Sequence, residues 1–203
     1  MMLSMTSFIF LFNLFAVRSL FQVSGGNSRQ KLKGDILSLA QKTKRGLIET
    51  PEEKQLMAKL FASLEKLNPN KASLESKFLP AVWKLEYTTS DGILGRTDGN
   101  ERVGNIYQQI DTKNLRAQNS EVVKYFKLFN IPRKVTANLT PLSKSKVKVQ
   151  FDKFSVGPLQ IKAPASSKVE LDITYVDEDL RLSRGDKGNI FVLTRYSDLK
   201  GVF

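Results

Sequence analysis

The clearest pattern in this chain is a strict alternation of apolar and polar side chains over residues 168–176, KVELDITYV. The apolar positions are Val169, Leu171, Ile173 and Tyr175. A period of two is typical of a β-strand with one buried face and one solvated face. Residues 180–182 form a second extended piece, and the turn formers at 184–189 predict a hairpin into a closing strand at 190–194. The C-terminal part of the chain is therefore predicted to be an antiparallel meander.

The same period of two recurs between residue 79 and this meander. The alternating segments cover residues 83–87, 103–111, 134–139 and 146–151, with a short apolar piece at Ile161. Roughly six to nine strands, with turns and no crossover helices between them, argue for an antiparallel barrel or sandwich. We favour the barrel, because closure removes the edges that long regular strands would expose. The predicted fold class is mainly β, with an antiparallel β-barrel over residues 79–203.

Helical periodicity precedes the strands and predicts an N-terminal two-helix segment over residues 34–78. A short helix is expected at 33–44, and a second should begin where Thr50, Pro51 and Glu53 supply a cap, a first-turn proline and a capping box. Its apolar stripe consists of Leu56, Leu60, Phe61, Leu64 and Leu67. The stripe could dock a partner, but apolar helical stripes usually pack in a core, so we favour a cover for the sheet.

Residues 1–33 have the composition of a targeting segment. The apolar block at 8–17 is interrupted by Asn13 and ended by Arg18. About ten residues is the length of a signal-peptide core and too short to span a bilayer, which needs about twenty. The basic stretch at 20–33 contains no acid and has transit-peptide composition. We predict a plastid protein with a bipartite signal and transit N-terminus; a plain secreted protein or an N-terminal anchor are the alternatives.

The charge balance bears on partners. The sequence has 32 Lys and Arg against 20 Asp and Glu, a formal net charge of +12. Such a charge suits a lipid headgroup surface, an acidic protein or nucleic acid. The basic residues are spread along the chain and no stretch interleaves them with stacking aromatics, so we predict no nucleic-acid partner.

The sequence contains neither cysteine nor histidine. This composition excludes disulfides, a thiolate nucleophile, a zinc–sulfur site and any Ser-His triad. An enzyme would have to work through carboxylates, lysine or tyrosine alone. We therefore predict a protein that is not an enzyme, with no catalytic residue, no cofactor and no metal.

The acidic run at Asp177, Glu178 and Asp179 is the obvious candidate against that prediction. A calcium loop spreads its ligands over about a dozen residues with a glycine at the bend, and three consecutive acids point in different directions. We predict instead a solvated turn in which these acids form ion pairs with Arg181 and Arg184.

Trp83, the only tryptophan, opens the first predicted strand. In an even-stranded antiparallel barrel the last strand pairs with the first, so its end lies beside the start of the first strand. Arg195 ends the last predicted strand. We predict that the guanidinium of Arg195 lies over the indole of Trp83 and closes that end of the barrel.

The alternation also assigns faces. The side chains predicted to line the barrel interior are Tyr87, Phe151, Leu171, Ile173 and Tyr175. Lys146, Lys148 and Lys168 lie on the opposite face of two of these strands and are predicted to hold the protein on an anionic membrane.

Four segments together resemble a known family, the plastid lipid-associated proteins, also called plastid fibrillins or plastoglobulins. The segments are TPEEKQLMAKLFASLEKLNP at 50–69, WKLEYTTS at 83–90, VGNIYQQID at 103–111 and DITYVDEDLRLSRGDKGNIFVLTR at 172–195. The resemblance covers residues 37–195, and the last segment is long and specific. It implies a lipocalin-like barrel and a non-enzymatic protein of thylakoids or plastoglobules that binds or shields lipids. One subgroup is associated with prenyl-diphosphate synthesis, which implies a prenyl-diphosphate synthase as a partner.

These observations lead to one expected function and one alternative. The expected function is binding of an apolar plastid lipid, of the prenylquinone or carotenoid class, inside the barrel. The alternative is a scaffold that docks on a plastid prenyl-lipid biosynthetic enzyme through the face that runs from Leu56 to Leu67.

Overall fold

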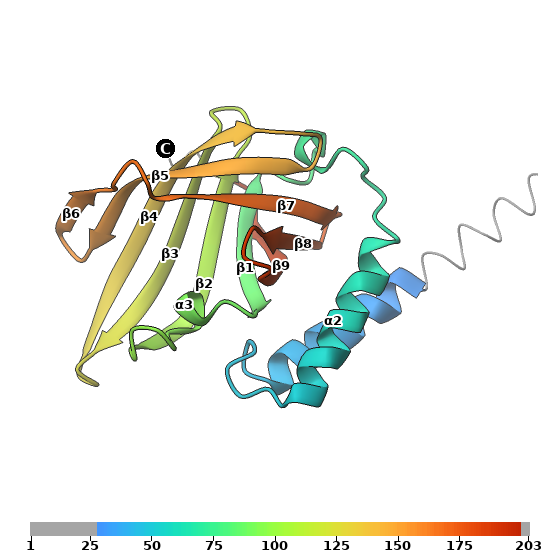
Figure 1. Cartoon of the computed structure of the whole chain (residues 1–203), viewed down its shortest axis with the longest axis horizontal. Helices are drawn as coiled ribbons and strands as arrows, with labels where there is room; N and C mark the ends of the chain where they lie inside the picture. Colours follow the sequence, from blue (N-terminus) through green and yellow to red (C-terminus); the bar gives the residue numbers. More distant parts are fainter. Residues whose placement is uncertain (1–27, 200–203) are drawn as a thin grey trace, which may run out of the picture.

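The computed structural model describes residues 28–199, in which a curved antiparallel sheet forms a barrel and two helices lie together against one side of it (Figure 1). Its elements are α2 (Pro51–Glu65), η1 (Ser73–Glu75), β1 (Ala81–Thr88), α3 (Asp91–Leu94), β2 (Glu101–Asp111), β3 (Arg116–Tyr125), β4 (Phe129–Pro141), β5 (Lys146–Val156), β6 (Leu159–Lys162), β7 (Lys168–Val176), β8 (Leu180–Gly185) and β9 (Ile190–Ser197). A further helix covers residues 28–42. The predicted mainly β class with N-terminal helices is confirmed.

The barrel closes through eight antiparallel strands. The strand order is β4-β3-β2-β1-β9-β8-β7-β5, and β4 pairs with β5 to complete the circle. The first and last strands are neighbours, as the barrel prediction requires. Strand β5 is shared: its first half pairs with β7 through Gln150, and its second half pairs with the short strand β6 from Lys153 onward.

The helix before α2 begins earlier than the sequence pattern predicted. Residues 28–33 are already helical, so the predicted boundary at 34 falls inside this helix. Lys33 is buried there, and its amine lies 2.5 Å from a carboxylate oxygen of Asp177 and 3.2 Å from one of Asp179. Residues 1–27, with the predicted signal core and cleavage point, lie outside the described residues.

The acidic turn thus pairs with a helix rather than with the arginines that follow it. Asp177 and Asp179 contact Lys33, whereas Arg184 forms a two-point ion pair with Glu65 of α2. The prediction of ion pairing was correct in kind, but its partners, Arg181 and Arg184, were wrong. Sequence neighbours are poor partners here because β8 extends away from the turn that precedes it.

Helix α2 begins as predicted and covers the barrel wall. The Thr50 hydroxyl accepts from the Glu53 amide and the Glu53 carboxylate accepts from the Thr50 amide, which completes the capping box. Met57, Phe61 and Leu64 are buried against the barrel, while Leu56 of the predicted stripe is 48% exposed. The stripe therefore serves mainly as a cover for the sheet.

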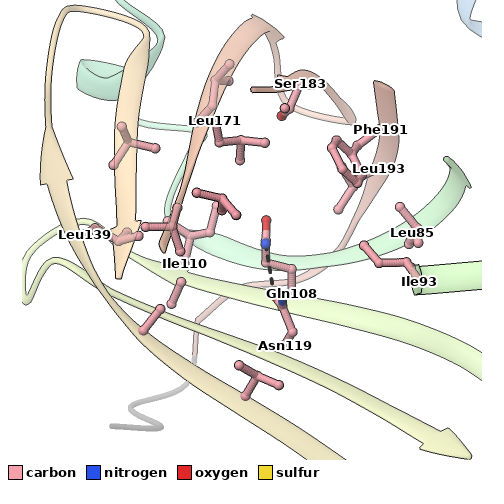
Figure 2. A pocket seen from close by; sticks show the side chains of 18 of the residues that line it. Leu85, Ile93, Gln108, Ile110, Asn119, Leu139, Leu171, Ser183, Phe191 and Leu193 are labelled. Carbon is pink, nitrogen blue, oxygen red and sulfur yellow. Dashed lines mark hydrogen bonds between the residues drawn. The ribbon is translucent and has the colours of Figure 1, made fainter. Parts of the chain in front are cut away.

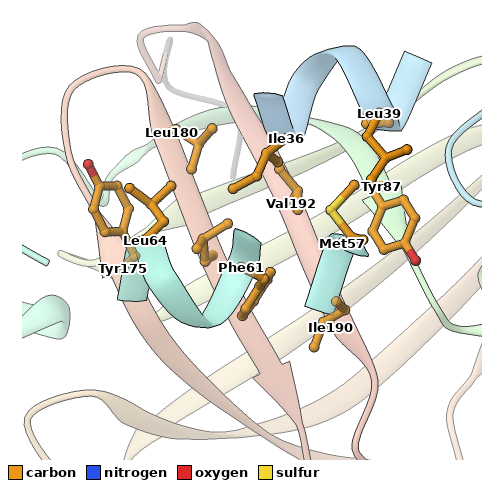
Figure 3. Close-up of a cluster of buried hydrophobic side chains, with 12 residues drawn as sticks. Ile36, Leu39, Met57, Phe61, Leu64, Tyr87, Tyr175, Leu180, Ile190 and Val192 are labelled. Atoms are coloured by element: carbon orange, nitrogen blue, oxygen red, sulfur yellow. The ribbon is translucent and has the colours of Figure 1, made fainter. Parts of the chain in front are cut away.

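The covered wall contributes to two separate apolar clusters. The helix–wall cluster lies between the helices and the outer face of the barrel (Figure 3). It consists of Ile36, Leu39, Ala40, Met57, Phe61, Leu64, Tyr87, Tyr175, Leu180, Leu182, Ile190 and Val192. The interior cluster consists of Leu79, Ala81, Trp83, Leu85, Ile106, Ile110, Ile173, Val176 and Leu193. The same strands thus bury both of their faces.

Two β-bulges decide which residues belong to which cluster. The β1–β9 register shifts between Leu85 and Tyr87, and the β7–β8 register shifts between Ile173 and Tyr175. A bulge places one extra residue in a strand and reverses the faces beyond it. Leu85 and Ile173 therefore belong to the interior cluster, whereas the tyrosines two positions later belong to the helix–wall cluster.

Candidate functional site

The barrel encloses a cavity of about 480 Å³ with a mainly apolar wall (Figure 2). Labelled side chains around it include Leu85, Ile93, Ile110, Leu139, Leu171, Phe191 and Leu193. Its volume lies within the range of small-molecule sites, about 300–1,000 Å³, and a mainly apolar wall with a few polar groups is typical of them. The candidate site is therefore the barrel interior.

Three of the five predicted lining residues border this cavity. Phe151 on β5 and Leu171 and Ile173 on β7 are part of its wall. Tyr87 and Tyr175 were predicted to join them, and that placement was wrong, because the two bulges turn both tyrosines to the outer face.

Both tyrosines join a buried ring to a polar partner at the edge of the helical cover. The Tyr87 hydroxyl donates to Glu49 at 2.5 Å, and the Tyr175 hydroxyl donates to Asp177. Burial, together with the adjacent carboxylate, raises the pKa of each tyrosine above its ordinary value. The phenols therefore remain neutral donors. The Tyr87 contact reaches the loop before α2, and Asp177 links Tyr175 to Lys33 of the first helix.

The predicted pair of Trp83 and Arg195 lies where the start of β1 meets the end of β9. The two residues are register partners on β1 and β9, and the guanidinium carbon lies 6.0 Å from the ring centroid. Arg195 also donates to the Phe78 carbonyl at 2.8 Å, and the indole N–H donates to the Leu79 carbonyl at 3.0 Å. The geometry is that of a guanidinium held over an aromatic face and fixed by a backbone carbonyl.

A second guanidinium approaches the same indole from the cavity side, and the sequence analysis missed it. Arg181 on β8 is 1% exposed, borders the cavity and lies 5.2 Å from the Trp83 centroid. It donates to the side-chain oxygen of Gln108, whose amide in turn donates to Asn119 at 2.9 Å (Figure 2). Burial lowers the pKa of Arg181 to about 9, so the group is still a cation at neutral pH.

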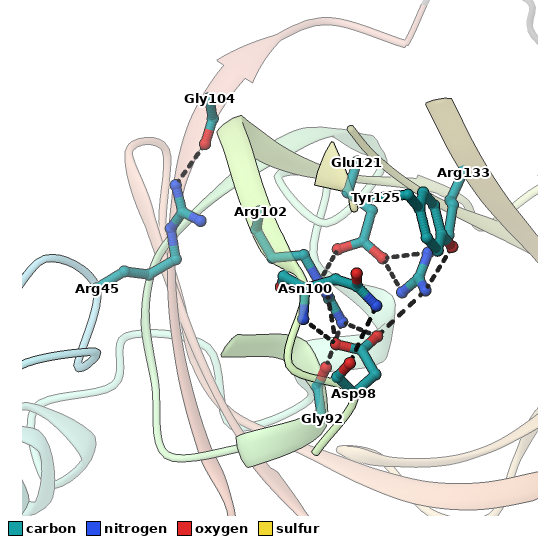
Figure 4. Close-up of polar contacts among 9 residues, drawn as sticks. All are labelled: Arg45, Gly92, Asp98, Asn100, Arg102, Gly104, Glu121, Tyr125 and Arg133. Atoms are coloured by element: carbon teal, nitrogen blue, oxygen red, sulfur yellow. Dashed lines mark hydrogen bonds and ion pairs between the residues drawn. The ribbon is translucent and has the colours of Figure 1, made fainter. Parts of the chain in front are cut away.

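An ionic network borders the cavity through Glu121 and Arg133, which are part of its wall, and Figure 4 shows its polar contacts. Glu121 lies between two guanidinium groups, 3.1 Å from Arg102 and 2.5 Å from Arg133. Arg102 also binds Asp98 at 2.9 Å and donates to the Gly92 carbonyl of α3. The hydrogen bond from Arg102 lowers the pKa of Asp98 below its ordinary value. The network ties α3 and its following loop to three barrel strands.

Two of the three predicted membrane lysines lie opposite acidic residues. Lys146 and Lys148 are register partners of Asp172 and Glu170 on β7, so acids offset part of their charge. Lys168 is exposed opposite Gln150.

A closed antiparallel barrel with an apolar cavity and a helical cover defines a lipocalin-like class of protein. Within residues 28–199, the helices are all too short or too polar to cross a bilayer.

Comparison with known proteins places the chain within this class. A family model described as PAP_fibrillin matches residues 30–194. Probable plastid-lipid-associated protein 5, chloroplastic, from Arabidopsis thaliana is 34% identical over 177 residues, which cover 86% of this chain and 73% of that protein. Probable plastid-lipid-associated protein 8, chloroplastic, from the same organism is 29% identical over 170 residues, or 79% and 70% of the two chains. Chromoplast-specific carotenoid-associated protein, chromoplastic, from Cucumis sativus is 27% identical over 218 residues, or 81% and 67%.

The chain therefore belongs to the PAP_fibrillin family and is a plastid lipid-associated protein. The similar proteins are named as chloroplastic or chromoplastic, in agreement with the plastid localisation predicted from residues 1–33.

Proposed function

We propose that the protein binds one apolar lipid, of the prenylquinone or carotenoid class, inside the barrel, at thylakoids or plastoglobules and without catalysing a reaction. The observation that carries this proposal is the 480 Å³ cavity with its apolar wall inside a closed barrel. Burial of a lipid chain there removes apolar surface of both partners from water, at about 25 cal/mol per Å². Phe151, Leu171 and Ile173 are the predicted contacts that border the cavity.

The scaffold alternative, with a prenyl-diphosphate synthase as the docked enzyme, relies on the face from Leu56 to Leu67. Phe61 and Leu64 of that face are buried in the helix–wall cluster, and Leu60 packs against it. Leu56 remains exposed. The structure thus gives less support to docking through this face than to binding within the barrel.

Lys146, Lys148 and Lys168 are proposed to attract the protein to anionic lipid surfaces. Each exposed lysine contributes about 1 kcal/mol near such a surface, and salt screens the contribution. Burial of an apolar ligand is not screened, so the two kinds of lipid contact are separable by ionic strength.

Trp83 provides the test of cavity binding, because this single tryptophan belongs to the interior cluster. We expect a short-chain prenylquinone to quench its fluorescence saturably, and native mass spectrometry to detect a one-to-one complex. Added salt should release the protein from anionic vesicles without releasing the quinone. Ile173→Asp should abolish quenching, whereas Lys146→Gln combined with Lys148→Gln, as the matched control, should leave it intact. Loss of the quinone at high salt, together with the vesicles, would exclude cavity binding.

A further inference from the structure

Among the polar side chains of the cavity wall, Arg181 and Ser183 stand out because both are buried and both keep atoms without a hydrogen-bond partner. Arg181 and Ser183 alternate with Leu180 and Leu182 on β8, so both point inward where the leucines point outward to the helices. Ser183 is fully buried and Arg181 is 1% exposed. Two positions along a strand are about 6.6 Å apart, so these side chains form one patch on the cavity wall.

The donors of this patch lack acceptors within the part of the chain that the structure describes. Nε and Nη1 of Arg181 and Oγ of Ser183 are buried without a hydrogen-bond partner. The remaining guanidinium nitrogen, Nη2, donates to Gln108. Buried polar groups are almost always hydrogen-bonded, and each exception calls for a partner at that place.

The charge of Arg181 is also uncompensated. Burial is the sole cause of its lowered pKa, and among residues 28–199 it forms no ion pair, whereas Arg102, Arg133, Arg184 and Arg195 all bind carboxylates. A buried cation is costly unless an acceptor or an anion faces it. The neighbouring indole of Trp83 supplies a cation–π contact but no acceptor for the two free N–H groups.

We propose that Arg181 and Ser183 form a head-group site that selects lipids bearing an acceptor oxygen over hydrocarbons of the same shape. The lipid chain lies along the apolar wall, and its oxygen accepts hydrogen bonds from the guanidinium and the hydroxyl. Carbonyl oxygens of a quinone ring and a carboxylate share this chemistry, and the carboxylate also neutralises the cation. The proposal rests on the cavity binding described under Proposed function and adds its head-group preference.

A matched ligand series tests the site. The probes are decyl-benzoquinone, 4-decylbenzoate and decylbenzene, which share a chain and a ring and differ in head oxygens. We expect the wild-type protein to bind the quinone and the benzoate at least about tenfold more tightly than decylbenzene. A ligand that cannot accept a hydrogen bond from a charged group loses affinity by at least about that factor. Trp83 quenching and calorimetry measure the three affinities.

Variants assign the preference to the patch. Arg181→Met, an apolar replacement of similar length, should retain decylbenzene binding and remove the preference for the oxygenated probes. Ser183→Ala should weaken the preference while changing the packing little. Arg195→Met is the matched control, because Arg195 contacts the same indole but is not part of the cavity wall. The control should keep the full preference.

The outcomes separate the two proposals. Equal affinity of all three probes for the wild-type protein would overturn the head-group site and leave cavity binding standing. Failure of all three to bind would overturn cavity binding itself. If Arg181→Met does not fold, the wild-type series and Ser183→Ala decide, and a preference for the oxygenated probes over decylbenzene that is unchanged in Ser183→Ala would overturn the site.

A separate surface, at the hairpin between β3 and β4, suggests how the protein contacts a lipid layer. The hairpin between β3 and β4 carries Phe126, Leu128 and Phe129, which are 83%, 76% and 60% exposed. Phe126 and Lys127 both have left-handed φ angles, of 51° and 59°. Turns of this kind strongly favour Asn and Gly, so a phenylalanine there lowers the stability of the fold. Because the ring of Phe126 is mostly exposed, its packing offsets little of this cost.

Basic side chains accompany this hairpin. Strand β6 pairs with β5, and the turn between them contacts β4 through a hydrogen bond from Gly157 to the Pro132 carbonyl. Strand β6 exposes Leu159 and Ile161, and Lys153 and Lys162 are exposed register partners on β5 and β6. Like charges directly opposite one another are destabilising unless an anion lies between or near them. We infer that the hairpin tip and β6 dock on an anionic lipid surface, with the aromatic side chains in the interface and the lysines at the headgroups.

Vesicle co-sedimentation tests this surface. Phe126→Ser combined with Phe129→Ser should reduce binding to vesicles of phosphatidylglycerol and phosphatidylcholine, and Lys153→Gln with Lys162→Gln should reduce its salt dependence. Leu56→Ser is the control, because Leu56 is 48% exposed on α2, which lies apart from the hairpin (Figure 1). Binding that is unchanged in the hairpin variant, or reduced equally in the control, would overturn the inference.

Discussion

The two faces of the wall formed by β1, β7, β8 and β9 differ in how they are filled. On the outer face, Met57, Phe61 and Leu64 of α2 pack in one cluster with Leu180 and Val192, and all of these side chains are fully buried. On the inner face, the side chains of the same strands border a cavity of about 480 Å³.

This difference separates stability from binding within a few strands. A filled cluster gains dispersion contacts on all sides, whereas a residue beside empty space lacks them on one side. We infer that the helical cover compensates for the incomplete packing of the interior. The comparison can be tested by substitutions placed on one face at a time.

The largest difference is expected between two phenylalanines. Phe61→Ala on the outer face should lower the free energy of unfolding by about 3–5 kcal/mol, because the cavity it leaves is enclosed by packed side chains. Phe191→Ala on the inner face should cost clearly less, since Phe191 already borders the cavity. Urea denaturation measures both. An equal cost for the two would show that the interior is packed as tightly as the outer cluster.

The second prediction concerns the place where the start of β1 meets the end of β9. Trp83→Ala should destabilise the protein by roughly 3–5 kcal/mol, because a large buried aromatic side chain is lost. Arg195→Ala should cost less, and the double variant should show a coupling energy of about 0.5–3 kcal/mol, as expected for residues in contact. Strict additivity in the denaturation data would argue that the 6.0 Å approach contributes nothing.

The third prediction concerns the loop between the two helices, which packs against the end of β1. Gly46 has a φ of +94°, and a Cβ there would lie 2.7 Å from the Thr88 carbonyl oxygen. Gly46→Ala should therefore cost about 1–3 kcal/mol. Gly99→Ala is the control, since Gly99 has a φ of +65° with open space around it. Equal shifts in thermal stability would mean that the close approach has no effect beyond the backbone conformation.

The smallest effect is expected from acid titration of the helical cover. Burial raises the pKa of Asp177, but hydrogen bonds from Lys33, Tyr175 and two backbone amides outweigh it and hold the pKa below its ordinary value. A lowered native pKa stabilises the fold above the unfolded value of about 3.9, and this contribution disappears as the pH falls further. Asp177→Asn should remove about 1 kcal/mol near neutral pH and flatten the stability profile below pH 4. A profile identical to wild type would contradict this role.

Much of the architecture could be predicted because it depends on local pattern. The alternation at residues 83–87 and 168–176 indicated strands, and the capping box at Thr50 indicated the start of α2. The strand β3 was not singled out, since RAQNSEVVKY lacks a regular apolar period.

The candidate site could be predicted only in part, for two physical reasons. A bulge adds one residue without a clear sequence signal, so extrapolated alternation placed Tyr87 and Tyr175 on the wrong face. In addition, an arginine between two leucines on a strand normally indicates a solvated face. On β8 the helices cover the leucines, so the face that carries Arg181 points into the barrel rather than to solvent. Local periodicity cannot reveal this, because it depends on packing against helices that are distant in the sequence.

The adjacency of β1 and β9 has a consequence for the order of folding. The helices over residues 28–42 and 51–65 pack against strands that end the chain, and the barrel closes only when β9 pairs with β1. A polypeptide that emerges from a ribosome or a translocation pore N-terminus first lacks most of the wall that its helices cover until β7, β8 and β9 have appeared. Contacts between such distant parts form slowly, because the loop entropy must be lost before they form. The chain is therefore expected to remain loose and threadable throughout passage into a plastid and to fold cooperatively once its last strand is inside.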